Sequence, residues 1–280
     1  MKNTTKNNGV RNKVLGVFVS LLFCTSSSFS QQDFPFQIGE QLDFVVYYKY
    51  GVVMTKAGSA QYTIKDHALN EKPTIRTSLT FKTAGVVDAA YRVKDTLYSH
   101  FTPELIPVLH RKHLNEGKTK YIDEIEFKKF SEKFTSVQSR RIRDGNMKFD
   151  TLLTANSLGY DMLGVFTFVR TLDYSDLKTG DKFVLTSFVG RDAVPLHIRY
   201  MGQAILDKGT VKYKTLKFGI DIIDTAFTEP KNAMEIWISD DQNHIPVKLK
   251  AKLKIGAAEA ELTSVKNLKY PFDSRIEIPQ

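Results

Sequence analysis

The chain has 280 residues, of which 42% are hydrophobic and 25% are charged, and its formal net charge is +9 at pH 7. This length is enough to bury a large core, in one β-rich domain or in two fused halves. Lysines and glutamates are interleaved rather than blocked, which excludes the basic stripe of a nucleic-acid-binding protein. Cys24 is the only cysteine, so a disulfide within the chain is excluded as well.

Residues 1–30 are predicted to be a signal peptide. A basic start without acidic residues precedes a short apolar core at 14–24, and Ser28 and Ser30 occupy the small-residue positions of a cleavage site. We predict cleavage after Ser30 and export to the periplasm or the outer membrane. Lipidation at Cys24 is the alternative, and the bulky Phe23 before it argues against that.

The mature chain is expected to touch membranes only peripherally. No apolar run after the signal peptide reaches the length of a membrane span. Loss of the four basic residues in the signal peptide lowers the net charge to +5, which suits weak attraction to an acidic membrane surface.

The first half of the mature chain alternates apolar and polar residues, which predicts strands. Short strands at this spacing are typical of a meander or a barrel rather than of βαβ units. Residues 84–90 are predicted to be an irregular or helical piece. The predicted strands are 41–50, 57–66, 75–81, 92–101, 105–114, 119–127 and 133–141.

The segment 161–172 differs from its surroundings because its apolar residues would cover most of a helix. A helix that is apolar nearly all round is buried. We therefore predict a helical plug or lid on the sheet. Arg170 would lie near its C-terminus, where the helix dipole favours a cation.

Strands resume after the helix, at 182–189, 194–201, 211–218 and 221–227, and two hairpins follow at 233–267. Apolar residues alternate with lysines from Ile245 to Ile255, which predicts one dry and one wet face. A type II′ turn at Gly256-Ala257 would place Lys252 opposite Glu261 and Lys254 opposite Glu259. In the hairpin before it, Met234 would face Leu249.

These elements predict an all-β, mainly antiparallel fold, a curved sheet or partly open barrel with one buried helix near 161–172. The segment 38–44 resembles 179–185, and each opens a run of strands. This echo suggests two similar halves, 31–150 and 175–280, joined by a helical segment at 155–174 within a single domain at 31–280.

Four stretches resemble a known family: the opening FQIGEQLDFVVYYKYG, the middle YRVKDTLYSHFTPELIPVLH, the helix ending Phe168-Val169-Arg170, and the close EIWISDDQNHIPVKLKAKLKIGAAEAEL. They are similar to the exported bacterial proteins grouped as domain of unknown function 3108. The resemblance covers nearly the whole mature chain. It implies a location in the cell envelope and a mostly antiparallel β architecture, and it implies no activity.

The motifs of common chemistries are absent from the sequence. There is no G-x-S-x-G nucleophile elbow and no glycine-rich phosphate loop. His110 and His113 would point to opposite faces of a strand, so they are predicted to be ordinary surface histidines. The acidic group Asp123, Glu124 and Glu126 is predicted to be a solvated strand face. No cofactor, metal site or nucleic-acid partner is expected.

Aromatic residues give the remaining functional lead, because aromatic side chains on the polar face of a sheet can line a ligand groove. The candidate ligand-binding residues are Tyr47, Tyr48, Tyr50, Arg170 and Trp237; burial of Trp237 under a neighbouring element is the alternative. We predict a non-enzymatic envelope protein whose curved sheet holds a hydrophobic or amphipathic ligand, such as a lipid, or an envelope partner. The other hypothesis is a hydrolase of envelope polymers that uses the carboxylates at 123–126 or the pair Asp221 and Asp224.

Overall fold

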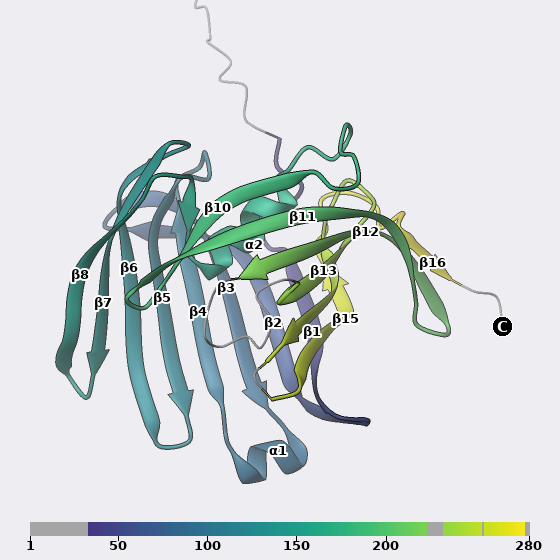
Figure 1. Cartoon of the computed structure of the whole chain (residues 1–280), viewed down its shortest axis with the longest axis horizontal. Helices are drawn as coiled ribbons and strands as arrows, with labels where there is room; N and C mark the ends of the chain where they lie inside the picture. Colours follow the sequence, from purple (N-terminus) through teal and green to yellow (C-terminus); the bar gives the residue numbers. More distant parts are fainter. Residues whose placement is uncertain (1–32, 223–231, 254, 278–280) are drawn as a thin grey trace, which may run out of the picture. The chain divides into compact units, whose positions relative to one another are not determined.

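A computed structural model describes residues 33–222, 232–253 and 255–277. From Phe34 onward the chain forms one unit, built mostly of strands (Figure 1). The helices are α1 (Gly85–Ala90) and α2 (Met162–Arg170). The predicted signal peptide and Cys24 lie outside the described residues. The strands are β1 (Gln41–Tyr50), β2 (Val53–Leu69), β3 (Lys72–Thr83), β4 (Lys94–Phe101), β5 (Pro107–Glu116), β6 (Thr119–Ser131), β7 (Phe134–Arg143), β8 (Asn146–Ala155), β9 (Gly159–Tyr160), β10 (Lys182–Val189), β11 (Asp192–Asp207), β12 (Val211–Ile222), β13 (Met234–Ser239), β14 (Pro246–Lys252), β15 (Ala257–Lys266) and β16 (Arg275–Glu277).

The strands form one sheet that curls into a nearly closed barrel (Figure 1). Its order is β8-β7-β6-β5-β4-β3-β2-β1-β15-β14-β13-β12-β11-β10-β9, with β16 attached to β12. The short β9–β10 pair is parallel, and the other described pairs are antiparallel. Two runs of consecutive strands meet where β1 pairs with β15. The predicted all-β, mainly antiparallel fold with a partly open barrel is confirmed.

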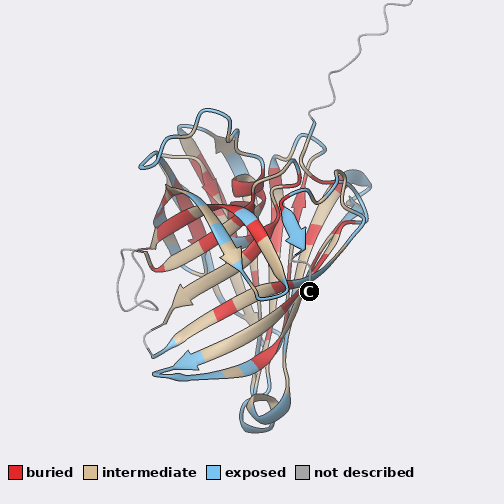
Figure 2. Cartoon of the chain, turned by 90° about the vertical axis from the view of Figure 1, so that its right-hand side faces the viewer, coloured by how far each residue is buried: buried red, intermediate tan, exposed pale blue. Residues whose placement is uncertain are grey.

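The core lies on the inner face of the sheet, the face that α2 covers. Phe166 of α2 packs on the ring of Tyr62 with 4.7 Å between ring centroids, and Val165 and Val169 join a cluster with Leu185 and other strand residues. Figure 2 shows buried positions alternating with less buried ones along the strands, as a sheet with one covered face requires. One row of paired residues on the inner face crosses eight strands: Leu42, Tyr62, Leu79, Leu97, Lys112, Asp123, Arg141 and Phe149.

Helix α2 confirms the predicted buried helix. The carboxylate of Asp161 caps it by accepting hydrogen bonds from the amides of Leu163 and Gly164 at 2.9 and 3.0 Å. At the other end, Arg170 forms two bonds of 2.6 and 3.0 Å with Glu40, and both side chains are fully buried. The sequence predicts the cation at this end of the helix but not its partner.

The predicted register of the β14–β15 hairpin is wrong, although its faces are right. Glu261 lies opposite Lys248 rather than Lys252. The amide of Leu253 donates to the carbonyl of Gly256 at 3.0 Å, so the chain reverses between these residues instead of at Gly256 and its successor. This displacement keeps the parity of the pairing, so the paired side chains of 248–252 and 257–261 stay on their predicted faces. Ile255, predicted on the dry face, instead lies in the turn and is 65% exposed, and Lys254 lies outside the described residues.

The register of β13 and β14 differs in the same way. Leu249 faces Ile236 rather than Met234, which faces Ala251. The pairing also shifts between Trp237 and Ile238, where a β-bulge interrupts the ladder. A bulge adds a residue to one strand only, and the sequence pattern gives no sign of it here.

Three strands, β8, β9 and β16, are not predicted from the sequence. In β8 the adjacent Leu152 and Leu153 break the alternation, and Leu152 is 60% exposed on this edge strand. Of the predicted strand 221–227, the first two residues continue β12 and the others lie outside the described residues.

The two segments that resemble each other in sequence have the same backbone turn. Gly39 precedes β1 with φ of 92°, and Gly180 precedes β10 with φ of 102°. Each glycine amide donates at 2.9 Å to a carbonyl of the adjoining strand, that of Ile64 or Tyr200. The division into two halves remains a prediction.

Candidate functional site

The two ends of the sheet meet at a seam. The tip of the β10–β11 hairpin lies against β7 and β8 there. The hydroxyl of Ser139 donates to the carbonyl of Gly190 at 2.5 Å, and the guanidinium of Arg191 donates to the carbonyl of Lys148 at 3.2 Å. These contacts between β7–β8 and the hairpin tip bring together the two strand runs at the seam.

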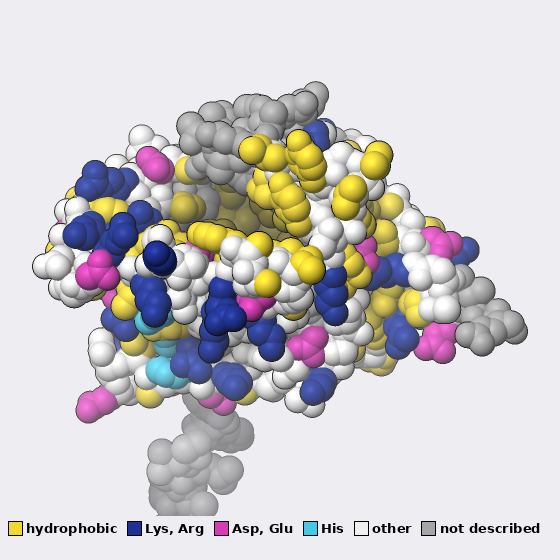
Figure 3. Space-filling model, turned by 90° about the horizontal axis from the view of Figure 1, so that it is seen from below, with side chains coloured by type: hydrophobic (Ala, Val, Ile, Leu, Met, Phe, Trp, Pro, Cys, Tyr) yellow, Lys and Arg dark blue, Asp and Glu magenta, His cyan; other side chains and the backbone are white. Residues whose placement is uncertain are grey.

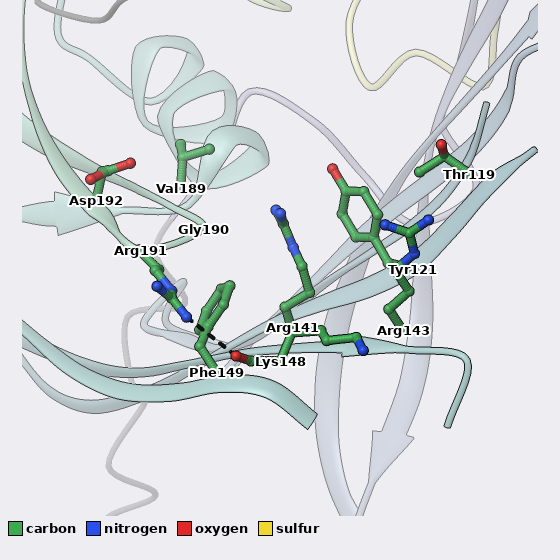
Figure 4. Close-up of a pocket in the computed structure, with 10 residues that line it drawn as sticks. All are labelled: Thr119, Tyr121, Arg141, Arg143, Lys148, Phe149, Val189, Gly190, Arg191 and Asp192. Carbon is green, nitrogen blue, oxygen red and sulfur yellow. Dashed lines mark hydrogen bonds between the residues drawn. The ribbon is translucent and has the colours of Figure 1, made fainter. Parts of the chain in front are cut away.

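A pocket of about 590 Å³ lies at this seam (Figure 4). One wall comes from β6, β7 and β8, and the other from the hairpin tip, so it combines residues far apart in the sequence. Its lining residues are Thr119, Tyr121, Arg141, Arg143, Lys148, Phe149, Val189, Gly190, Arg191 and Asp192.

Arg141 organises the pocket wall. Its guanidinium binds Asp123 through two hydrogen bonds of 2.6 and 2.7 Å and lies over the ring of Tyr121, 4.0 Å from the centroid. The hydrogen bonds to Asp123 raise the pKa of Arg141. Arg191 lies over the other aromatic ring, that of Phe149, at 4.8 Å. Guanidinium groups stacked on aromatic rings hold their charge in a fixed place.

The lining is cationic, with four basic side chains and one acidic one. Asp123 neutralises part of the charge of Arg141, and the exposed Arg143 has a long contact of 3.6 Å with Asp144. Lys148 and Arg191 add charge at the mouth, opposed within the lining only by Asp192. This arrangement suits an anion bound through charge-assisted hydrogen bonds, beside aromatic walls that suit an apolar or planar group.

The pocket lies at one end of the inner-face row that runs from Leu42 to Phe149. This row is apolar from Leu42 to Leu97 and carries Lys112, Asp123 and Arg141 nearer the pocket. Another row of the inner face, next to the ends of β1 and β15, is accessible. Figure 3 shows a hollow on this side of the molecule with hydrophobic side chains around it. The paired residues of that row are Tyr48, Ala258, Ala251, Met234 and Ile220, of which the first four are only partly buried.

The five predicted ligand-binding residues do not form one site. Arg170 is enclosed in the core with Glu40, and Tyr48 lies on the inner face, where its hydroxyl donates to the carbonyl of Ile255 at 2.8 Å. Tyr47 lies on the opposite face, and Tyr50 is 64% exposed at the end of β1.

Trp237 lies on the face opposite α2, among the charged residues of that face. The amino group of Lys217 is 4.7 Å from its ring centroid, and that of Lys248 is 6.0 Å away. The residue is partly buried, and Lys217 is bound to Glu235 at 2.7 Å. Its surroundings are therefore a network of ion pairs on the sheet.

The histidines His110 and His113 lie on opposite faces of β5, as expected, but His110 is not a surface residue. It is buried, with Nδ1 at 2.9 Å from the hydroxyl of Ser99 and 3.1 Å from the carboxylate of Asp161. The three residue types are those of a hydrolytic triad, yet Ser99 and Asp161 both contact the same ring nitrogen. No proton can be relayed across the ring in this arrangement, and the cluster supports the cap of α2.

The carboxylates of the hydrolase hypothesis are bound to cations. Asp123 pairs with Arg141 on the inner face, and Glu124 and Glu126 share Arg140 on the other face. Asp221 accepts from Arg199 at 3.3 Å and from the amide of Asn232 at 2.7 Å, while its predicted partner Asp224 lies outside the described residues.

The described part of the chain contains no group of three or more His, Cys, Asp or Glu side chains that could hold a metal ion. Among the helices of the same residues, none is long and apolar enough to cross a membrane.

A further histidine, His100, should make stability depend on pH. Burial, then the neighbouring His67 and Arg76, lowers its pKa to about 4, whereas a histidine in an unfolded chain titrates near 6.5. As pH falls from about 6.5 to about 4, only the unfolded chain takes up this proton. The free energy of unfolding should therefore fall, by at most about 1.4 kcal/mol per pH unit.

Urea denaturation at several pH values measures this effect. The fall should be smaller in His100→Phe and unchanged in His197→Gln, a control at an exposed position. If His100→Phe shows the same pH dependence as the wild-type protein, this histidine is not the cause.

The chain is similar to a family of proteins and to several solved structures. The family described as "Protein of unknown function (DUF3108)" matches residues 43–263. No curated protein matches the chain. A crystal structure of a β-barrel-like protein of the domain of unknown function DUF1849 from Brucella abortus is similar, with a TM-score of 0.54 and 8% identity; it covers 84% of this chain and 100% of that one.

Two further solved structures are less similar. One is an exported-protein candidate with a YmcC-like fold from Bacteroides fragilis, at a TM-score of 0.35 and 10% identity, covering 83% of this chain and 98% of that one. The other is a lipoprotein candidate from Parabacteroides distasonis, at a TM-score of 0.31 and 8% identity, covering 83% and 97%. The likeness to the Brucella protein is a likeness of fold alone.

Proposed function

Since this chain belongs to the DUF3108 family of proteins of unknown function, we propose from its own geometry that it is an exported, non-enzymatic binding protein of the bacterial cell envelope. Its ligand would be an anionic amphiphile, such as a fatty acid or a lipid with an acidic headgroup. The anionic group would lie in the seam pocket and the apolar part along the inner face of the sheet.

The observation that carries this proposal is the cationic lining of a pocket at the end of an inner-face row that is apolar from Leu42 to Leu97. Arg143, Lys148 and Arg191 are exposed at the pocket and have no buried carboxylate as a hydrogen-bonded partner among the described residues. Protein anion sites use such groups because the bound anion replaces water at little cost. The partly buried aromatic and aliphatic side chains nearby supply apolar contact area.

Hydrolysis is supported less well. The acidic groups that could act as general acid or base are held in ion pairs with arginines, which occupy their carboxylate oxygens. The seam pocket itself is lined by one carboxylate, that of Asp192. A binding role therefore has the stronger support.

Binding of a fluorescent fatty acid and of its methyl ester tests the proposal. The ester keeps the acyl chain of the acid but carries no charge, so the purified protein should bind the acid more tightly. The triple variant Arg143→Gln/Lys148→Gln/Arg191→Gln should lose about tenfold or more in affinity for the acid, which corresponds to about 1.4 kcal/mol, and little for the ester.

The matched control is Lys65→Gln/Lys72→Gln/Lys182→Gln, which removes three exposed charges outside the pocket lining. It should bind both probes as the wild-type protein does. Equal affinity of the wild-type protein for acid and ester, or equal losses in the two triple variants, would disprove the proposed anion site. If the acid binds as expected, mass spectrometry of lipids extracted from protein purified from its native envelope identifies the natural ligand.

A further inference from the structure

Three turns at one end of the barrel expose large apolar side chains to solvent. In the β1–β2 turn, Val52 is 98% exposed, and its neighbours Tyr50, Val53 and Met54 are exposed as well. Val86 on α1 is 74% exposed, and Ile255 in the β14–β15 turn is 65% exposed. Single exposed apolar residues are common on protein surfaces. Four exposed apolar residues within the five positions 50–54 form a cluster, and such clusters mark interaction surfaces.

These turns adjoin one another in the fold. The hydroxyl of Tyr48 donates to the carbonyl of Ile255 at 2.8 Å, which joins the β14–β15 turn to the end of β1. The amide of Ala84, just before α1, donates to the carbonyl of Ala57 on β2 at 2.9 Å. The amide of Gly117 donates to the carbonyl of Arg92 at 2.7 Å, which joins the β5–β6 turn to the segment after α1. We call this end of the barrel the rim.

The charge around the rim is positive. The segment 49–56 contains Lys49 and Lys56 and no acidic residue, and both lysines are exposed. The segment 82–94 contains Lys82, Arg92 and Lys94, against Asp88, which is bound to Arg92 at 3.1 Å. Figure 3 shows basic and hydrophobic side chains together around the hollow on this side of the molecule.

We propose that the rim is a docking surface for an anionic lipid bilayer. The apolar turns would enter the boundary between headgroups and acyl chains, and the lysines would contact lipid phosphates. Exposed apolar side chains flanked by cations have this affinity because burial in the bilayer adds to the attraction of the anionic surface. Docked in this way, the protein would turn its hollow toward the membrane.

This inference rests on the rim and not on the proposed ligand, because Tyr50, Val52, Val53, Met54, Val86 and Ile255 are all absent from the lining of the seam pocket. The two proposals can therefore fail separately. If the protein docks on membranes but binds no fatty acid, the docking proposal stands and the ligand proposal fails.

Flotation with vesicles of phosphatidylethanolamine and phosphatidylglycerol tests the docking, with vesicles of phosphatidylcholine alone as the uncharged comparison. The mature protein should float with the first and at least tenfold less with the second. Val52→Asp/Val86→Asp should lose at least tenfold in binding to the anionic vesicles and keep its affinity for the fluorescent fatty acid. Val184→Asp, a substitution at another valine that is 60% exposed, should bind vesicles as the wild-type protein does.

A second measurement reads insertion directly. Trp237 is the only tryptophan, so Trp237→Phe removes the background fluorescence, and Val52→Trp or Val184→Trp then places one reporter. The emission of the reporter at position 52 should shift to shorter wavelength on anionic vesicles, and that at 184 should not. No flotation of the wild-type protein, no difference between the two reporters, or vesicle binding unaffected by Val52→Asp/Val86→Asp would overturn the proposal.

Discussion

Replacing Arg170 with methionine should lower the free energy of unfolding by about 3 to 5 kcal/mol. The substitution leaves the fully buried carboxylate of Glu40 without the two hydrogen bonds that neutralise it. The carbonyl of Asn243 loses a donor at 2.9 Å, and the stack of the guanidinium over Phe36, at 5.2 Å, disappears. A buried charge without a partner is among the most destabilising changes that one substitution can make.

Urea denaturation of Arg170→Met and of the double variant Glu40→Met/Arg170→Met measures this. Because a buried ion pair pays a large desolvation cost, its replacement by two apolar side chains should recover most of the lost stability. Arg170→Lys should lie between, since lysine keeps the charge but not the two-pronged geometry. A single variant as stable as the wild-type protein would show that Glu40 is not stranded by the loss.

Gly256→Val should destabilise the protein by about 3 kcal/mol or more. Gly256 has φ of 75°, which β-branched residues strongly disfavour. A Cβ atom there would also lie 2.3 Å from the carbonyl oxygen of Lys49 and 3.0 Å from the hydroxyl of Tyr48. The backbone of β1 cannot move away without disturbing its pairing with β15, so both costs add.

Gly51→Val is the matched control, because Gly51 also has a positive φ, 57°, but has nothing within 4 Å of its Cβ position. It should cost only the backbone strain, about 1 to 2 kcal/mol. Thermal and urea melts of both variants separate the two contributions. Equal losses would mean that the contact with Lys49 costs nothing, and that the β14–β15 turn can shift freely.

The strands and the buried helix could be predicted because each has a regular apolar period. β1 and β10 have the predicted bounds, since Leu42 and Phe44 alternate with polar neighbours and glycines end the turns before both strands. The registers could not be predicted, because the turn of β14–β15 and the bulge at Trp237 depend on backbone geometry that several sequences permit. The faces were predictable nevertheless, since an even displacement preserves them.

The candidate site could not be predicted because its parts are distant in the sequence. Arg141 and Arg143 are two positions apart and so would share one face of a strand, which is a usable signal, but Phe149 belongs to the unpredicted β8. Arg191 reaches the pocket only through closure of the sheet. The ion pair of Arg170 could not be predicted for the same reason, because its partner Glu40 lies far upstream in the sequence.

The order of strands has a consequence for how the chain is made. Nearly every strand pairs with its neighbour in sequence and is joined to it by a short turn, so most pairing is local and fast. The β1–β15 ladder is the longest exception, because it joins the first strand to one near the end of the chain, and the short β12–β16 pair is another. During synthesis β1 therefore keeps one free edge until β15 has emerged, and a free edge invites pairing with other chains. We therefore expect the β1–β15 pairing to be both a slow step of folding and the step at which aggregation is most favoured.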